Sequence, residues 1–422
     1  MNKQKIYKSD LELFLSIIIF FFSFIDPITL YISMFASLLL LSKGYTGFVK
    51  LMILYTLRTV ISPGLFFPIS EYPFFQYFKW LMIFGVSTLI IAFNIKKNRI
   101  FQPLFLLYTV FIIYLVISSY FYSHNINLAI SKIINYSLPM FALLLIKEKL
   151  DSTKLIYWFS SLMKWTTIIS LPLILLPLGY LRNGHAYQGI FDNPNMLGIL
   201  LVISFATLVS SNHMNFQKYL ISVLYLLLIY LSESRTSMMG FIILLIIIMI
   251  TSRVNIIKKI LVFLFSFVVI GLSYFTPIYD KFLLFAFKGQ KKSEMLYSRE
   301  GQLESFRVAF KRSPIFGNGF GVPINLNIHV ISKGTIVEAG NIFLALIMYS
   351  GIVGLILFLI IVIFWMFKIN KYYFIVFLST ILINLGEMVL FSSNSIGLLC
   401  SILWVLALKK YILNDVKDFN FI

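Results

Sequence analysis

The sequence is poor in charged residues and nearly lacks cysteine. Only 12% of its 422 residues are Asp, Glu, Lys or Arg, whereas 60% are hydrophobic. A typical soluble domain carries about 25% charged residues, so the composition excludes a soluble globular fold and is typical of an integral membrane protein. Cys400 is the single cysteine, which excludes a disulfide framework and a thiolate metal site.

Metal-ligand pairs and acidic residues are also scarce. The four histidines, His124, His185, His213 and His329, show no paired ligand spacing, so we predict no zinc site and no other cofactor. The chain has 16 acidic and 35 basic residues, a net charge of +19. Cytoplasmic connectors of membrane proteins are rich in Lys and Arg, and such a charge also suits anionic lipid headgroups. We therefore expect contact with membrane lipids and no nucleic-acid binding.

Long apolar stretches are abundant. A membrane-crossing helix needs about 20 mainly apolar residues, because its backbone polar groups find no water in the hydrocarbon core. About fourteen such stretches predict an all-α polytopic membrane protein. They lie near residues 11–25, 27–42, 45–62, 75–94, 101–121, 127–146, 154–179, 194–210, 216–231, 236–251, 257–276, 341–367, 371–391 and 395–409.

Basic residues alternate between successive connectors and predict the orientation. Connectors such as 96–99, 147–154 and 253–259 are basic, whereas those between them are short and poor in Lys and Arg. The basic set faces the cytoplasm, so both termini are predicted to be cytoplasmic. We divide the chain into a transmembrane bundle of about 11 spans (1–276), a large extracytoplasmic loop containing short helices (277–340), and about three spans with a cytoplasmic tail (341–422).

Two arginines are predicted to need an anion. A helix expected at Glu294 to Arg312 places Arg299 on the same stripe as Leu303, Phe306 and Phe310. A guanidinium on a packed face is costly unless an anion meets it, whereas Arg307 is more typical of a solvated charge.

The second of these arginines lies in the turn Ser232 to Ser237. There Arg235 begins a helix, where the dipole disfavours a cation. An anionic ligand, Glu233 or Glu387 would compensate. Arg58 and Glu387 fall near the outer ends of their spans, and an ion pair and a substrate role are both open for them.

Two asparagine-containing segments precede helices on the outer side. In the segment from Gln188 to Gly198, Asp192 or Asn193 is expected to be an N-cap, with Pro194 in the first turn. The same helix start, with Asn195, would also suit a phosphate. Glu338 to Asn341 leads into the next long span.

In order, these segments resemble the family that includes O-antigen polymerase (Wzy) and O-antigen ligase. The resemblance covers about residues 185 to 365, and before that only the number of spans agrees. The matching elements are GIFDNPNMLG at Gly189 to Gly198, Ser234-Arg235, Arg299, PIFGNGFG at Pro314 to Gly321, and EAGN at Glu338 to Asn341, continuing to Gly354.

This resemblance implies a metal-independent glycosyltransferase at the outer face of the bacterial cytoplasmic membrane. A sugar hydroxyl of an acceptor would displace polyprenyl pyrophosphate from a donor glycan with inversion, and Arg235 and Arg299 would stabilise the leaving group. Arg58, Arg182 and Arg307 are second-rank members of the same cluster. The expected substrate-binding residues are Arg58, Arg182, Asn193, Asn195, Arg307, Asn341 and Glu387.

The general base and the exact reaction are left open by the resemblance. Ligases of this family have a His directly before the Asn that ends the large loop, and here that residue is Gly340. Glu338 is the nearest proton acceptor, His329 is the next, and a reaction without a strong base is the third possibility.

We therefore expect a polymerase of capsular, exopolysaccharide or O-antigen repeat units. A chain-length regulator and a flippase are candidate further partners. The alternatives are a ligase, a lipid-linked oligosaccharide flippase and a scaffolding protein. A flippase would instead have mid-membrane charges and short outer loops.

Overall fold

The structure, a computed structural model, describes residues 3–66, 72–95, 103–211, 215–251, 285, 297–322, 340–392 and 395–409. Within these ranges the regular elements are helices, joined in two places by isolated β-bridges. The α-helices are α1 (Lys3–Phe22), α2 (Pro27–Ser37), α3 (Tyr45–Thr59), α4 (Pro73–Trp80), α5 (Val86–Asn94), α6 (Pro103–Tyr122), α7 (Ile126–Ile146), α8 (Ser152–Ser170), α9 (Pro194–Ser210), α10 (Phe216–Leu231), α11 (Arg235–Thr251), α14 (Tyr297–Arg312), α15 (Ile342–Lys368), α16 (Phe374–Asn384) and α17 (Ile396–Ala407).

Several helices have the length and composition of membrane spans. In the described part of the chain, five helical runs are long and apolar enough to cross a bilayer, and seven shorter helices are apolar. The five are Pro73–Asn94, Pro103–Tyr122, Ile126–Lys149, Ser152–Leu175 and Ile342–Lys368. These helices confirm an all-helical, multi-pass membrane protein. The total of about fourteen spans and the extent of the large loop stay predictions, because 257–276 and most of 277–340 lie outside the described residues.

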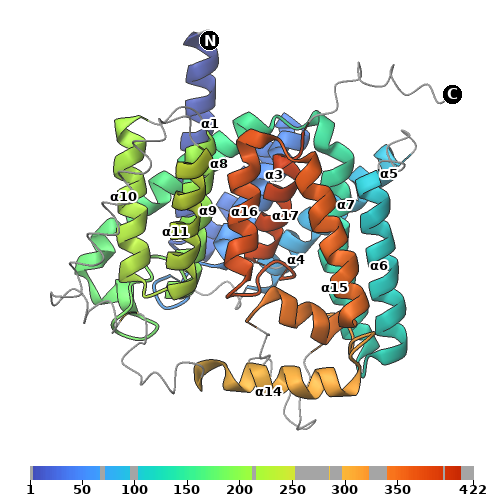
Figure 1. Cartoon of the computed structure of the whole chain (residues 1–422). Coiled ribbons are helices and arrows are strands. Elements are labelled where there is room, and N and C mark those ends of the chain that lie inside the picture. Colours follow the sequence, from blue (N-terminus) through green and yellow to red (C-terminus); the bar gives the residue numbers. More distant parts are fainter. Residues whose placement is uncertain are drawn as a thin grey trace.

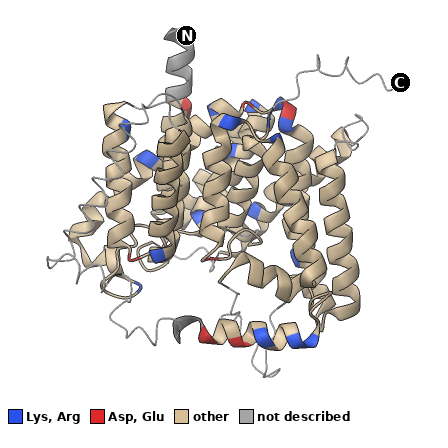
Figure 2. Cartoon of the chain, viewed as in Figure 1, with Lys and Arg blue, Asp and Glu red and all other residues tan. Residues whose placement is uncertain are grey.

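The helices pack side by side, and α14 runs across one end of the bundle (Figure 1). Helix α17 is buried along its whole length, and α9 from Leu197 to Leu208. Helices α10 and α11 lie toward the edge of the bundle, and each exposes apolar side chains such as Leu227 and Ile242. Lys and Arg are most frequent at the end of the bundle opposite α14 (Figure 2). The orientation with α14 outside and the basic end toward the cytoplasm stays a prediction from the charge of the connectors.

Helix α15 is broken at Gly351, which has a φ of +67°. Glycine adopts this left-handed conformation without steric cost. A break exposes backbone groups, which in hydrocarbon need partners within the protein. The segment Pro314 to Gly319 supplies them through Ile352 N to Pro314 O (2.9 Å), Asn318 N to Met348 O (2.9 Å) and Gly319 N to Tyr349 O (3.1 Å).

The glycine-rich segment Pro314 to Gly321 is therefore a docking segment. A Cβ at Gly317 would collide with the backbone of Ser350, and one at Gly319 would lie 2.5 Å from Oγ of Ser123. Phe320 N also donates to Oγ of Ser119 in α6 at 3.0 Å. The segment thus fixes the carboxyl end of α14 against α6 and α15.

Candidate functional site

The start of α9 contributes two asparagines. Asn193 is the N-cap, and its side-chain oxygen accepts from Met196 N at 2.9 Å, with Pro194 in the first turn. The expected cap is confirmed, and it is Asn193 rather than Asp192. Asn195 lies two residues farther along and donates from Nδ2 to Oε1 of Glu387 at 2.8 Å.

Arg235 is the first residue of α11, as predicted, and its side chain is half-buried. The start of this helix packs closely on two neighbours. A Cβ at Gly198 of α9 would lie 2.6 Å from Oγ of Ser237, and one at Gly386 would collide with the Thr236 side chain. Because Thr236 follows Arg235 and Gly386 precedes Glu387, this approach brings those two ionisable residues to one place.

Asn341 is the N-cap of α15 and accepts from Phe343 N at 2.8 Å. Its Nδ2 donates to the carbonyl of Leu385 at 2.7 Å. The starts of α9, α11 and α15 therefore all contact the segment Leu385 to Glu387. We call Asn195, Arg235, Asn341 and Glu387 the helix-start cluster.

Electrostatics favour an anion at the helix-start cluster. Each helix start presents backbone N–H groups and the positive end of its dipole. Three such starts meet on the segment Leu385 to Glu387. The formal charges of Arg235 and Glu387 are opposite, so the helix starts supply the remaining partial positive charge.

Glu233, a second candidate counter-charge for Arg235, has another partner. Its carboxylate Oε2 lies 3.3 Å from Nε2 of His185. Glu233 also has a φ of +52°, which is unusual for a residue with a side chain. The backbone of the same loop is attached by Tyr187 N donating to Leu231 O at 2.9 Å. This pairing holds the loop before α9 against the turn before α11.

Arg299 lies in the first turn of α14, within the helix predicted at Glu294 to Arg312. The packed stripe differs slightly from the prediction. Phe306 is half-buried and Ala309 is fully buried, but Phe310 is 37% exposed. The face toward the bundle is thus centred on Gln302, Phe306 and Ala309, and position 299 falls on that face by helical spacing.

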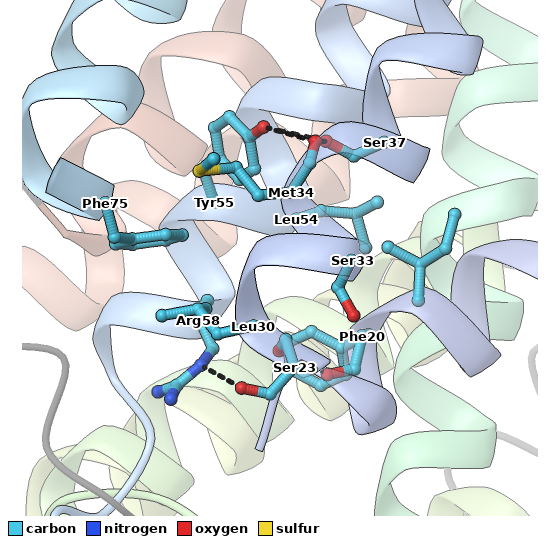
Figure 3. A pocket seen from close by; sticks show the side chains of 11 residues that line it. Phe20, Ser23, Leu30, Ser33, Met34, Ser37, Leu54, Tyr55, Arg58 and Phe75 are labelled. Atoms are coloured by element: carbon cyan, nitrogen blue, oxygen red, sulfur yellow. Dashed lines mark hydrogen bonds between the residues drawn. The ribbon is translucent and has the colours of Figure 1, made fainter. Parts of the chain in front are cut away.

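Arg58 lines a small cavity between α1, α2, α3 and α4 (Figure 3). It is 3% exposed, its Nε donates to the carbonyl of Ser23 at 3.2 Å, and its guanidinium lies 5.2 Å from the centre of the Phe24 ring. These contacts join Arg58 to the α1–α2 turn. The end of α3 is also bonded to the segment before α9, because Asp192 N donates to Val60 O and Ser62 N donates to Ile190 O, each at 2.9 Å.

Two second-rank arginines point into solvent. The side chains of Arg182 and Arg307 are exposed, and Arg182 N donates to Oε1 of Gln188 at 2.8 Å. The proposed base Glu338 and the fallback His329 lie outside the described residues.

Residues 220–359 match the family model Wzy_C, described as O-antigen ligase. The match includes Arg235, all of α14, the docking segment and the helix-start residue Asn341. No curated protein matches the chain. The matched part of the sequence holds two of the four residues of the helix-start cluster, Arg235 and Asn341, and all of α14. Over residues 220–359 the sequence is similar to the O-antigen ligase family, which supports the resemblance to O-antigen polymerases and ligases.

Proposed function

We propose that this protein polymerises polysaccharide repeat units carried on polyprenyl pyrophosphate at the outer face of the bacterial cytoplasmic membrane. The units would be capsular, exopolysaccharide or O-antigen units. The observation that carries the proposal is the meeting of three helix starts and Arg235 on the segment Leu385 to Glu387, at the end of the bundle that α14 crosses.

The reaction forms a bond between an acceptor sugar oxygen and the donor anomeric carbon, and breaks the bond from that carbon to the pyrophosphate oxygen. Negative charge develops on the departing lipid pyrophosphate. Preorganised guanidinium groups and helix N-termini stabilise such charge. Arg235 and Arg299 would do so as catalytic residues.

The hydroxyl proton of the acceptor must also leave. Glu338 is the proposed acceptor of that proton because it precedes the helix-start residue Asn341 by three positions. His329 is the second candidate. Without either group, leaving-group stabilisation by the arginines would supply most of the catalysis.

The remaining cluster residues would bind the two lipid-linked glycans. Asn195 and Asn341 each have a second Nδ2 hydrogen for a sugar hydroxyl, besides the one donated to Glu387 or to Leu385, and Glu387 accepts hydrogen bonds. The proposed substrate-binding set also includes Arg58, Arg182, Asn193 and Arg307.

A ligase, which moves finished polymer to a different acceptor, is the second candidate. It is favoured by the description of the matching family model as O-antigen ligase. The residue before Asn341 weighs against it, because that residue is Gly340 and not histidine.

The deciding experiment deletes the gene and determines the size and location of the glycan. A polymerase is indicated if long chains disappear while single repeat units still reach the cell surface. Polymer that stays on its lipid carrier would indicate a ligase, and single units trapped inside would indicate a flippase. A plasmid copy of the wild-type gene must restore long chains in the same strain.

A further inference from the structure

Gln302 is a polar residue on the packed face of α14. It is half-buried, one helical turn before Phe306 and three residues after Arg299. Residues three apart on a helix lie on one face, about 4.5 Å apart along its axis. Position 299 of α14 therefore lies on the same helix face as Gln302.

The Gln302 carboxamide lies against the start of α15. A Cβ added to Gly340 would be 2.7 Å from Oε1 and 3.1 Å from Nε2 of Gln302. Gly340 immediately precedes Asn341, so the carboxamide lies beside the helix-start cluster. Among the described residues, no group forms a hydrogen bond with this carboxamide. A half-buried amide without a protein partner retains a donor and an acceptor for a ligand.

We propose that Gln302 positions the attacking hydroxyl of the acceptor sugar. This inference rests on the proposed polymerase function. An amide offers an oxygen that accepts from a hydroxyl and an N–H that donates to a ring or hydroxyl oxygen, and it keeps both at any physiological pH. Arg299 would hold the departing pyrophosphate, and Gln302 the incoming hydroxyl.

The test separates the acceptor from the donor. Lipid-linked repeat units from the deletion strain serve as donor. The same units, released from lipid by mild acid and labelled at the reducing end, serve as acceptors that cannot donate. Purified wild-type protein must convert the labelled acceptor into longer labelled chains. If it does not, the proposed polymerase function is wrong, and this outcome is independent of the role of Gln302.

Gln302→Ala is expected to raise the KM for the labelled acceptor about three- to tenfold, the effect of one lost hydrogen bond. The KM for the lipid-linked donor should stay unchanged. Glu304→Ala, on the exposed face of the same helix, is the matched control and should change neither KM. An unchanged acceptor KM in Gln302→Ala, with an active wild type, overturns the inference and leaves the proposed function standing.

A double-mutant cycle tests the contact itself. Gly340→Ala places a methyl group against the Gln302 carboxamide and should raise the acceptor KM of the wild-type background. In the Gln302→Ala background the same substitution should have no effect, because the displaced group is gone. Equal effects in both backgrounds would show that Gly340 acts by another route and would overturn the positioning role. Both variants must elute as the wild type does in size-exclusion chromatography.

Discussion

The break of α15 at Gly351 and the start of α15 at Asn341 differ in the hydrogen bonds that they form. Backbone groups form them at the break, and side chains form them at the start. At the break, backbone groups of Ile352, Met348 and Tyr349 all bond to the docking segment. At the start, Asn341 and its neighbours bring side chains from several helices together. The break is a structural joint, whereas the start belongs to the proposed substrate site.

The largest effect is expected at the break. Gly351→Ala would force a left-handed φ on a residue with a Cβ, and that Cβ would collide with the carbonyl of Ile315. With a ψ of −171° this is a conformation adopted essentially by glycine alone, which costs another residue about 1–3 kcal/mol, and the collision adds to it. We expect most of the folded protein to be lost, measured as the monodisperse fraction and the Tm after detergent extraction.

The matched control is Gly301→Ala on α14, because no atom lies within 4 Å of the added Cβ. Alanine is favoured over glycine in a helix by about 1 kcal/mol, so the Tm should stay the same or rise slightly. If Gly351→Ala is folded as well as Gly301→Ala, the joint at the break is not needed for stability.

At the start of α15 the comparison predicts loss of activity without loss of protein. Arg235→Ala and Arg299→Ala should each reduce chain growth about 100-fold or more, the usual cost of removing a group that stabilises transition-state charge. Protein level should remain that of the wild type. Glycan length by gel electrophoresis and membrane protein by immunoblot provide the two measurements.

Lys311→Ala is the control for lost positive charge, because Lys311 is an exposed residue of the same helix α14. It should grow chains of normal length. Glycan chains of wild-type length in both arginine variants would refute the catalytic assignment of Arg235 and Arg299. A reduced protein level would show that these arginines are needed for stability, as Gly351 is expected to be.

A smaller effect is expected from the pair Asn195 and Glu387, whose atoms lie 2.8 Å apart. A hydrogen bond to a charged group contributes about 1.5–3 kcal/mol, so Asn195→Ala and Glu387→Ala should each slow chain growth about tenfold. The double variant should be no slower than either single variant, because the interaction can be lost only once. Glu387→Gln keeps an accepting oxygen and should retain more activity than Glu387→Ala.

The sequence was informative where a local rule decides the structure. The cap at Asn193, the start of α11 at Arg235 and the helix ending at Arg312 follow from residue types and spacing, and the structure has all three. Long apolar stretches likewise predict helices that cross a membrane.

Contacts between distant segments could not be predicted in this way. The break at Gly351 has no local signal, because it depends on the docking of Pro314 to Gly319 against α15. The Asn195 bond to Glu387 joins residues 192 positions apart. Helical spacing in the sequence predicts that Gln302 lies on the same helix face as Phe306. Its contact with Gly340 could not be predicted, because it depends on the fold.

The smallest effect is expected on the pH dependence of the Tm, from a histidine beside the docking segment. His124 lies in the turn between α6 and α7, one residue after the Ser123 that packs on Gly319. Partial burial and the nearby charge of Arg312 lower the pKa of His124. Since this folded-state pKa lies below the ordinary value near 6.5, the unfolded chain binds more protons, and stability falls as the pH drops through this range. The His124→Gln variant should therefore lose less Tm between pH 7.5 and pH 5 than the wild type, by about 1 °C because the side chain is largely exposed. An identical Tm loss in both proteins would mean that the attachment of the α14 end to this turn does not depend on His124.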